Sequence, residues 1–123
     1  MKVEPEIEDS GSEVVKQETN NDLYKIRVGY LDYTLLYENK VTDIMGKEVS
    51  GYFQPEPQLL KVQASLSDAQ VAEITIHEII HAMEHSYDFS LSEKKVERLA
   101  IAFATFFKDN PEFMETLILN LQS

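Results

Sequence analysis

The sequence lacks cysteine and tryptophan, and it holds only four glycines and four prolines in 123 residues. Without cysteine there can be no disulfide and no thiolate metal site, so any transition metal must be bound by histidine or carboxylate. Basic residues are also scarce, with 11 lysines and arginines against 22 aspartates and glutamates and a formal net charge of −11. Such an acidic surface repels phosphate backbones and anionic membranes, so we expect neither nucleic acid nor membrane among the partners.

Long hydrophobic runs are missing as well. No run approaches the roughly 20 apolar residues that are needed to cross a bilayer. The acidic N-terminus also lacks the apolar core of a signal peptide. We therefore expect a cytoplasmic protein. The length suits one domain, and a hydrophobic content of 43% is enough for one core.

The chain is predicted to consist of a disordered acidic tail at residues 1–22 and a single domain at residues 23–123. The tail holds seven acidic and two basic residues. Its few apolar residues, such as Val14 and Val15, have no partner at helical or strand spacing, so it buries too little surface to offset the entropy of ordering. A solubilising role and a partner-binding role are both open for this tail.

The first half of the domain has the alternation of apolar and polar residues that is typical of strands. This pattern predicts strands at residues 23–28, 31–37 and 59–64, with a shorter one at 51–54. Gly29 and Tyr30 predict a tight turn between the first two strands. Residues 38–50 are predicted to form a loop, and Pro55 and Pro57 predict a turn or a sheet edge because neither can donate to a ladder.

The second half has helical periodicity and predicts helices at about 68–86, 91–108 and 111–121. Ser67 with Gln70, and Ser90 with Glu93, have the spacing of capping boxes, and Asn110 before Pro111 predicts the third N-terminus. Apolar residues follow at core spacing: Val96, Leu99, Ala100, Phe103, Phe106 and Phe107, then Phe113, Met114, Leu117, Ile118 and Leu121. Strands followed by helices predict an α+β fold, with a small antiparallel or mixed sheet packed on three helices.

All three histidines lie on the first predicted helix, and two of them belong to the motif His77-Glu78-Ile79-Ile80-His81. At 100° per residue, His77 and His81 are about 40° apart, so both imidazoles can bind one zinc ion. Glu78 points beside the metal, where its carboxylate can take a proton from water that the metal activates. His85 lies about 12 Å from His77 along the axis, too far to share that ion. It is either an exposed histidine or a donor to the transition state at the edge of the cleft.

A catalytic zinc ion needs a third protein ligand, and only carboxylates remain. Glu97 lies at the edge of the apolar stripe of the second predicted helix, beside the small Ala100, which would let the two helices approach closely. Glu93 lies on nearly the same edge but is also explained as the capping-box partner of Ser90. We predict Glu97 as the third ligand. The alternatives are Glu93 as ligand, or a surface ion pair between Glu97 and a neighbouring basic residue.

The motif at residues 77–81, followed by Glu97-Arg98-Leu99-Ala100-Ile101-Ala102-Phe103-Ala104, resembles the ImmA/IrrE-type metallopeptidases, especially small versions associated with phages and prophages. The resemblance covers about residues 23–121. It implies a zincin-like minimal domain with one zinc ion bound by His77, His81 and Glu97, and with Glu78 as general base. It also implies a protein or peptide substrate, such as a transcriptional repressor.

Three functions follow from these observations. The first is a zinc-dependent peptidase that cuts one specific partner protein. The second is a catalytically silent metal-binding or protein-interaction module of the same fold. Glu78 favours the first, because a structural zinc site has no use for a carboxylate that does not bind the metal. The third is an acidic adaptor that binds no metal.

Overall fold

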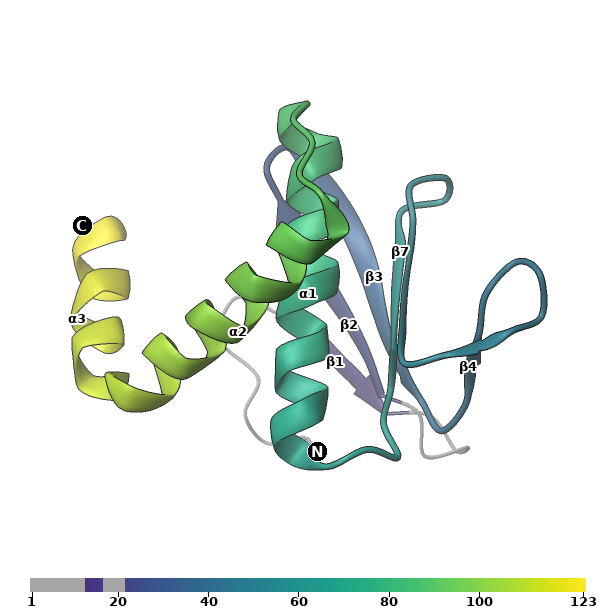
Figure 1. The fold of residues 1–123 in the computed structure, drawn as a ribbon. Helices are drawn as coiled ribbons and strands as arrows, with labels where there is room; N and C mark the ends of the chain where they lie inside the picture. The colour runs from purple at the N-terminus through teal and green to yellow at the C-terminus, as the bar shows by residue number, and fades with distance from the viewer. Residues whose placement is uncertain (1–12, 17–21) are drawn as a thin grey trace.

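The computed structural model describes residues 13–16 and 22–123, which form strands first and helices afterwards (Figure 1). This order confirms the predicted α+β class. The elements are β1 (Glu13–Lys16), β2 (Asp22–Val28), β3 (Leu31–Glu38), β4 (Val41–Thr42), β5 (Glu48–Val49), β6 (Gly51–Gln54), β7 (Leu59–Gln63), α1 (Asp68–Tyr87), α2 (Glu93–Asp109) and α3 (Pro111–Leu121).

The main sheet is mixed, with the strand order β1-β2-β3-β7-β6. Only β3 and β7 are parallel; the other neighbours are antiparallel. The predicted hairpin is confirmed between β2 and β3, where Gly29 takes the positive φ of 64° that its turn requires. In the described part of the chain β6 pairs with β7 alone, so its other edge is free. That free edge becomes important at the site described below.

Two segments differ from the sequence prediction. Within the predicted loop at 38–50, β4 and β5 form a small antiparallel ribbon, whose turn is closed by the Asp43 carboxylate accepting from two backbone N–H groups. Within the predicted tail, β1 pairs with β2 and places Val14 opposite Tyr24. The sequence Glu13-Val14-Val15-Lys16 is short and has two adjacent valines instead of the alternation that indicates a strand. The rest of the predicted tail, residues 1–12 and 17–21, lies outside the described residues.

Helix α1 lies against one face of the sheet and forms the centre of the fold (Figure 1). It begins at the predicted capping box, in which the Ser67 hydroxyl accepts from the Gln70 N–H and the Gln70 side chain accepts from the Ser67 N–H. Its Val71 and Ala82 are fully buried against β7, with Leu60 and Val62 in the same cluster. A helix held along its length in this way presents its remaining side chains at fixed positions.

Helix α2 crosses α1 and then diverges from it, and it carries α3 away from the sheet (Figure 1). Val96 and Ala100 are buried against Ile80 of α1, but they are the only buried members of the predicted α2 core stripe. No residue of α3 is buried, so the prediction that its apolar residues belong to the core of this chain is wrong. Among the described residues, no helix is both long and apolar enough to cross a bilayer.

Candidate metal centre

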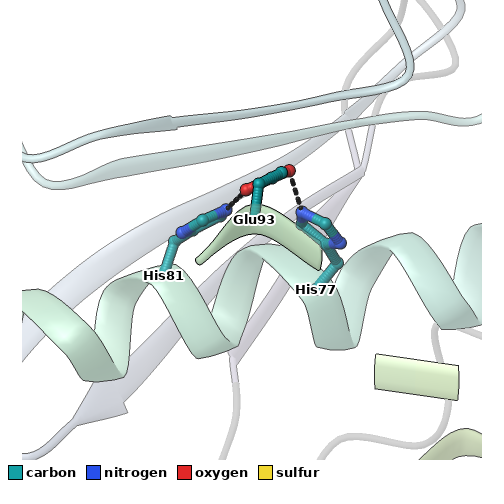
Figure 2. Close-up of side chains that lie close together, drawn as sticks. All are labelled: His77, His81 and Glu93. Atoms are coloured by element: carbon teal, nitrogen blue, oxygen red, sulfur yellow. Dashed lines mark hydrogen bonds and ion pairs between the residues drawn. The ribbon is translucent and has the colours of Figure 1, made fainter. Parts of the chain in front are cut away.

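The first turn of α2 and the middle of α1 bring three potential metal ligands together (Figure 2). The Glu93 carboxylate lies between the two histidines of the motif, with one oxygen 2.9 Å from His77 Nε2 and the other 3.1 Å from His81 Nε2. Each of the three residues offers one ligand atom within 4.8 Å of the other two. His77, His81 and Glu93 therefore form a group that could hold a metal ion.

The third member of this group is Glu93 and not the predicted Glu97. The prediction placed Glu93 in a capping box with Ser90, but the N-cap is Ser92, whose hydroxyl accepts from the Lys95 N–H. Helix α2 therefore begins at Glu93, two residues later than expected. This start leaves the Glu93 side chain free to reach α1, in the helix turn where a carboxylate is also favoured by the helix dipole. Glu97 lines the same cleft one turn further along.

The protonation of the histidines decides what this group can bind. Nδ1 of His81 lies 2.6 Å from the Glu84 carboxylate, so a neutral His81 ring keeps its proton there and turns the lone pair of Nε2 toward Glu93. The Nε2 lone pair of His81 and the Glu93 oxygen 3.1 Å away are then both acceptors, so a proton or a cation must lie between them. Imidazole nitrogens and a carboxylate oxygen are the ligands that zinc takes when cysteine is absent, so the donor set fits such an ion.

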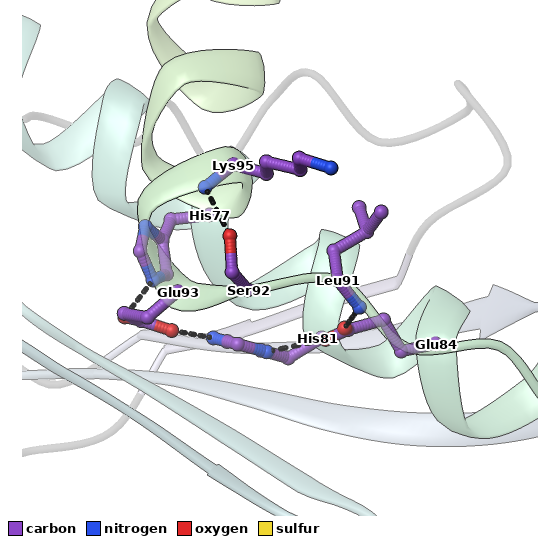
Figure 3. A network of polar contacts seen from close by, with 7 residues as sticks. All are labelled: His77, His81, Glu84, Leu91, Ser92, Glu93 and Lys95. Atoms are coloured by element: carbon purple, nitrogen blue, oxygen red, sulfur yellow. Dashed lines mark hydrogen bonds and ion pairs between the residues drawn. The ribbon is translucent and has the colours of Figure 1, made fainter.

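Glu84 is a residue that the sequence prediction missed. It lies one turn after His81 on α1, and its side chain is only 14% exposed. One carboxylate oxygen accepts from His81 Nδ1, and the other accepts from the backbone N–H of Leu91 at 2.6 Å (Figure 3). Glu84 thus orients the His81 ring, and it also holds in place the connection between α1 and α2 that precedes Glu93. Its spacing of three residues from His81 is the only local signal that could have indicated this role.

We expect Glu84→Gln to weaken metal binding by roughly 10- to 100-fold without unfolding the protein, because the variant loses the negative charge that orients the His81 ring and strengthens it as a ligand. Competition with a chromogenic chelator measures the change. Glu73→Gln is the matched control, since it removes the same charge from the same helix at a residue that lines the cleft without contacting His81. Equal metal affinity in both variants would contradict the role of Glu84.

Glu78 lies beside this group and is only 6% exposed. Burial raises the pKa of its carboxyl from 4.5 to about 7, against the lowering effect of His81, and the charge of Glu93 raises it further. The close approach of β6 contributes to the burial: a Cβ atom on Gly51 would lie 2.5 Å from Glu78 Oε2. Glycine at position 51 therefore lets the edge strand lie directly against the Glu78 carboxylate.

An open cleft runs along this group between β6, α1 and the start of α2. One part, of about 370 Å³, is lined by Gly51, His77, Glu78, Glu93 and Glu97 among others. A shallower part continues past Tyr52 and Phe53 to His81. The Phe53 ring of β6 stacks on the His81 ring with 6.3 Å between ring centroids, and its centroid lies 6.0 Å from that of the His85 ring. His85 is exposed at this end of the cleft, and its predicted part in catalysis stays a prediction.

The geometry and the donor atoms of this centre are what indicate a metal site. Compared with protein-family models, with curated proteins and with solved structures, the chain gives no match.

Proposed function

We propose that this protein is a zinc-dependent peptide hydrolase of the zincin type, which cuts a specific partner protein. The observation that carries the proposal is the combination of three potential metal donors with the buried carboxylate of Glu78 beside them. Catalytic zinc sites use three protein ligands and keep one position open, whereas structural sites are closed by four. His77, His81 and Glu93 supply the three, and Glu78 is left for the chemistry.

Glu78 has the properties of a general base. A base works best when its pKa lies near the operating pH, and burial raises the pKa of this carboxyl to about 7. Its place in the wall of the cleft lets it accept a proton from a water molecule there and later donate it to the leaving amine. A bound zinc ion supplies the complementary Lewis acidity toward water and toward a carbonyl oxygen.

The free edge of β6 supports a peptide as the substrate. Gly51, Tyr52 and Phe53 line the cleft together with the two histidines, and in the described part of the chain no strand is hydrogen-bonded to the outer edge of β6. An extended peptide that adds to such an edge forms main-chain hydrogen bonds with it. It would then lie across the metal group and within reach of Glu78. The resemblance to ImmA/IrrE-type peptidases motivates a transcription regulator as the natural substrate.

The proposal is tested by metal analysis and by hydrolysis of a mixture of unstructured peptides followed by mass spectrometry. We expect about one zinc ion per chain, cleavage that is lost on chelation, and cleavage that returns when zinc is added back. Cleavage that survives chelation would contradict the metal mechanism. Zinc binding without hydrolysis of any peptide or regulator protein would instead support a catalytically silent metal-binding module.

A further inference from the structure

The apolar stripe of α2 is covered along its first half only. Val96 and Ala100 pack against α1, but the same stripe one and two turns later is open, with Phe103 44%, Phe106 43% and Phe107 39% exposed. Helix α2 diverges from α1 (Figure 1), and an open cleft separates Ala104, Thr105 and Lys108 from the first turns of α1. The hydrophobic pattern that builds the core at one end of this helix therefore continues onto the surface at the other.

The exposed aromatic residues continue across the corner between α2 and α3. The Phe103 and Phe107 rings stack at 5.8 Å, Phe106 contacts Phe107 at 6.4 Å, and Phe106 also contacts Phe113 of α3 at 6.5 Å. Leu117 and Leu121 follow Phe113 at intervals of four residues and are also exposed. We call this surface the apolar ridge: Phe103, Phe106, Phe107, Phe113, Leu117 and Leu121.

Helix α3 depends on this ridge being covered. It has 11 residues, and none of them is buried in the chain. A helix shorter than about 12–15 residues is marginal in water on its own, because packing of an apolar face supplies most helix stability. The contacts between α2 and α3 are few. Contacts from beyond the described residues must therefore hold α3 in place.

From these observations we infer that the apolar ridge is the interface of a homodimer. The exposed fractions of the six side chains amount to about 600 Å² of apolar surface, if each is taken as about 200 Å². A standard interface buries about 800 Å² on each partner, of which about 60% is apolar. The ridge thus supplies the apolar area that a stable twofold dimer needs.

The charge distribution favours a second copy over other partners. Two chains with a net charge of −11 repel each other, so they can associate only where the surface carries little charge. Residues 99–107 contain no charged side chain, and α3 contains only Glu112 and Glu115. Lys108, Asp109 and Glu112 flank the corner, and in a twofold pairing the lysine of each copy can face an acidic residue of the other. A basic partner would instead be drawn to the acidic surfaces elsewhere.

The dimer leaves the candidate metal centre accessible. Glu93 lies in the first turn of α2, whereas the ridge begins at Phe103, nearly three turns later on the same helix. Dimer formation and metal binding therefore occupy opposite ends of one helix. The inference stands independently of the proposed hydrolase activity, and the two can be tested separately.

Sedimentation equilibrium of the full chain tests the inference. We expect twice the chain mass of 14.1 kDa at micromolar concentrations. Phe106→Glu places a charge in the centre of the ridge and should raise the dimer dissociation constant by roughly 100-fold. Ile101→Glu is the matched control, because Ile101 is 47% exposed on the same helix but faces away from the ridge. It should leave the dissociation constant unchanged.

Phe113→Glu, on α3, is a second variant that disrupts the ridge, for use if Phe106→Glu fails to fold. Circular dichroism and zinc binding, measured on each variant, report whether it is folded. The inference is overturned if the wild-type chain is monomeric at every concentration, even if it then binds lipid vesicles or its own residues 1–12 or 17–21 cover the ridge. Equal association of Phe106→Glu, Phe113→Glu and Ile101→Glu would overturn it as well.

Discussion

Glu93→Ala is expected to weaken zinc binding by at least about 100-fold, while Glu97→Ala changes it only a few-fold. Loss of a direct ligand costs more affinity than the 10- to 100-fold that is typical when a residue hydrogen-bonded to a ligand is lost. The reason is the position of the Glu93 carboxylate, whose two oxygens lie 2.9 and 3.1 Å from the Nε2 atoms of His77 and His81. Without it, the metal loses a ligand and its only anionic donor. Isothermal titration with zinc, or competition with a chelator, measures the difference.

The Glu93 and Glu97 variants control for each other. Both glutamates line the same cleft on the same helix, so a general effect of lower negative charge would weaken binding equally in the two. Helix stability is also comparable, since alanine favours helix in both positions. Retained affinity in Glu93→Ala together with lost affinity in Glu97→Ala would mean that α2 must shift by a turn when the metal binds. In that case the arrangement described here would not be the metal-binding one.

The two candidate start points of α2 show why the third ligand could not be predicted from the sequence. Ser90 and Ser92 are both good N-cap residues, and Ser90 also has Glu93 three residues later, which is the stronger local signal. The structure uses Ser92, whose hydroxyl accepts from the Lys95 N–H, while the Leu91 N–H donates to Glu84 and holds the connection against α1. That hydrogen bond joins residues on two different elements. A local pattern contains no information about it.

The fold shows the same division between local and long-range information. Local sequence patterns were sufficient to predict the β2–β3 hairpin, the capping box of α1 and the existence of the three helices, because each depends on neighbours in the sequence. Strand β1, which pairs with the adjacent β2, was missed because its four residues show no alternation of apolar and polar side chains. Periodicity also predicted the apolar stripes of α2 and α3 correctly as stripes. It could not indicate that the described part of the chain leaves much of these stripes exposed.

The motif on α1 was the most predictable part of the site. The spacing of His77 and His81 on one helix determines that both imidazoles face the same way, and the structure gathers them around a single carboxylate. The burial of Glu78 was not predictable, since it arises from the edge strand lying against the helix at Gly51. Burial is the main cause of the raised pKa of the Glu78 carboxyl. The chemically important property of Glu78 therefore comes from the fold and not from the motif.

Glu78→Gln should abolish peptide hydrolysis, lowering the rate by roughly 100- to 10,000-fold, while zinc still binds with a stoichiometry of about one per chain. Glutamine keeps the size and polarity of glutamate but cannot accept the proton. Activity on the peptide mixture and zinc content are measured on the same preparation. Hydrolysis at the wild-type rate would exclude Glu78 as the base, and loss of zinc would mean that the residue is a ligand.

The same substitution should make the metal-free protein more stable above pH 7. The folded-state pKa of Glu78 is raised from 4.5 to about 7, so the folded state binds this proton more tightly than the unfolded state does. Stability from the protonated carboxyl is fully present below pH 4.5 and is lost as the pH rises to about 7. The loss is on the order of 3 kcal/mol for a shift of this size.

Glutamine stays neutral throughout, so Glu78→Gln should escape this loss. The difference in free energy of unfolding between variant and wild type, measured by urea denaturation after chelation, should therefore be small near pH 4.5 and should grow toward pH 7. A residue that serves only the fold would lose stability when substituted. Greater stability combined with lost hydrolysis is the result expected of a carboxylate kept in a costly environment for its chemistry, because such residues trade stability for function. A variant less stable than wild type at neutral pH would contradict that interpretation.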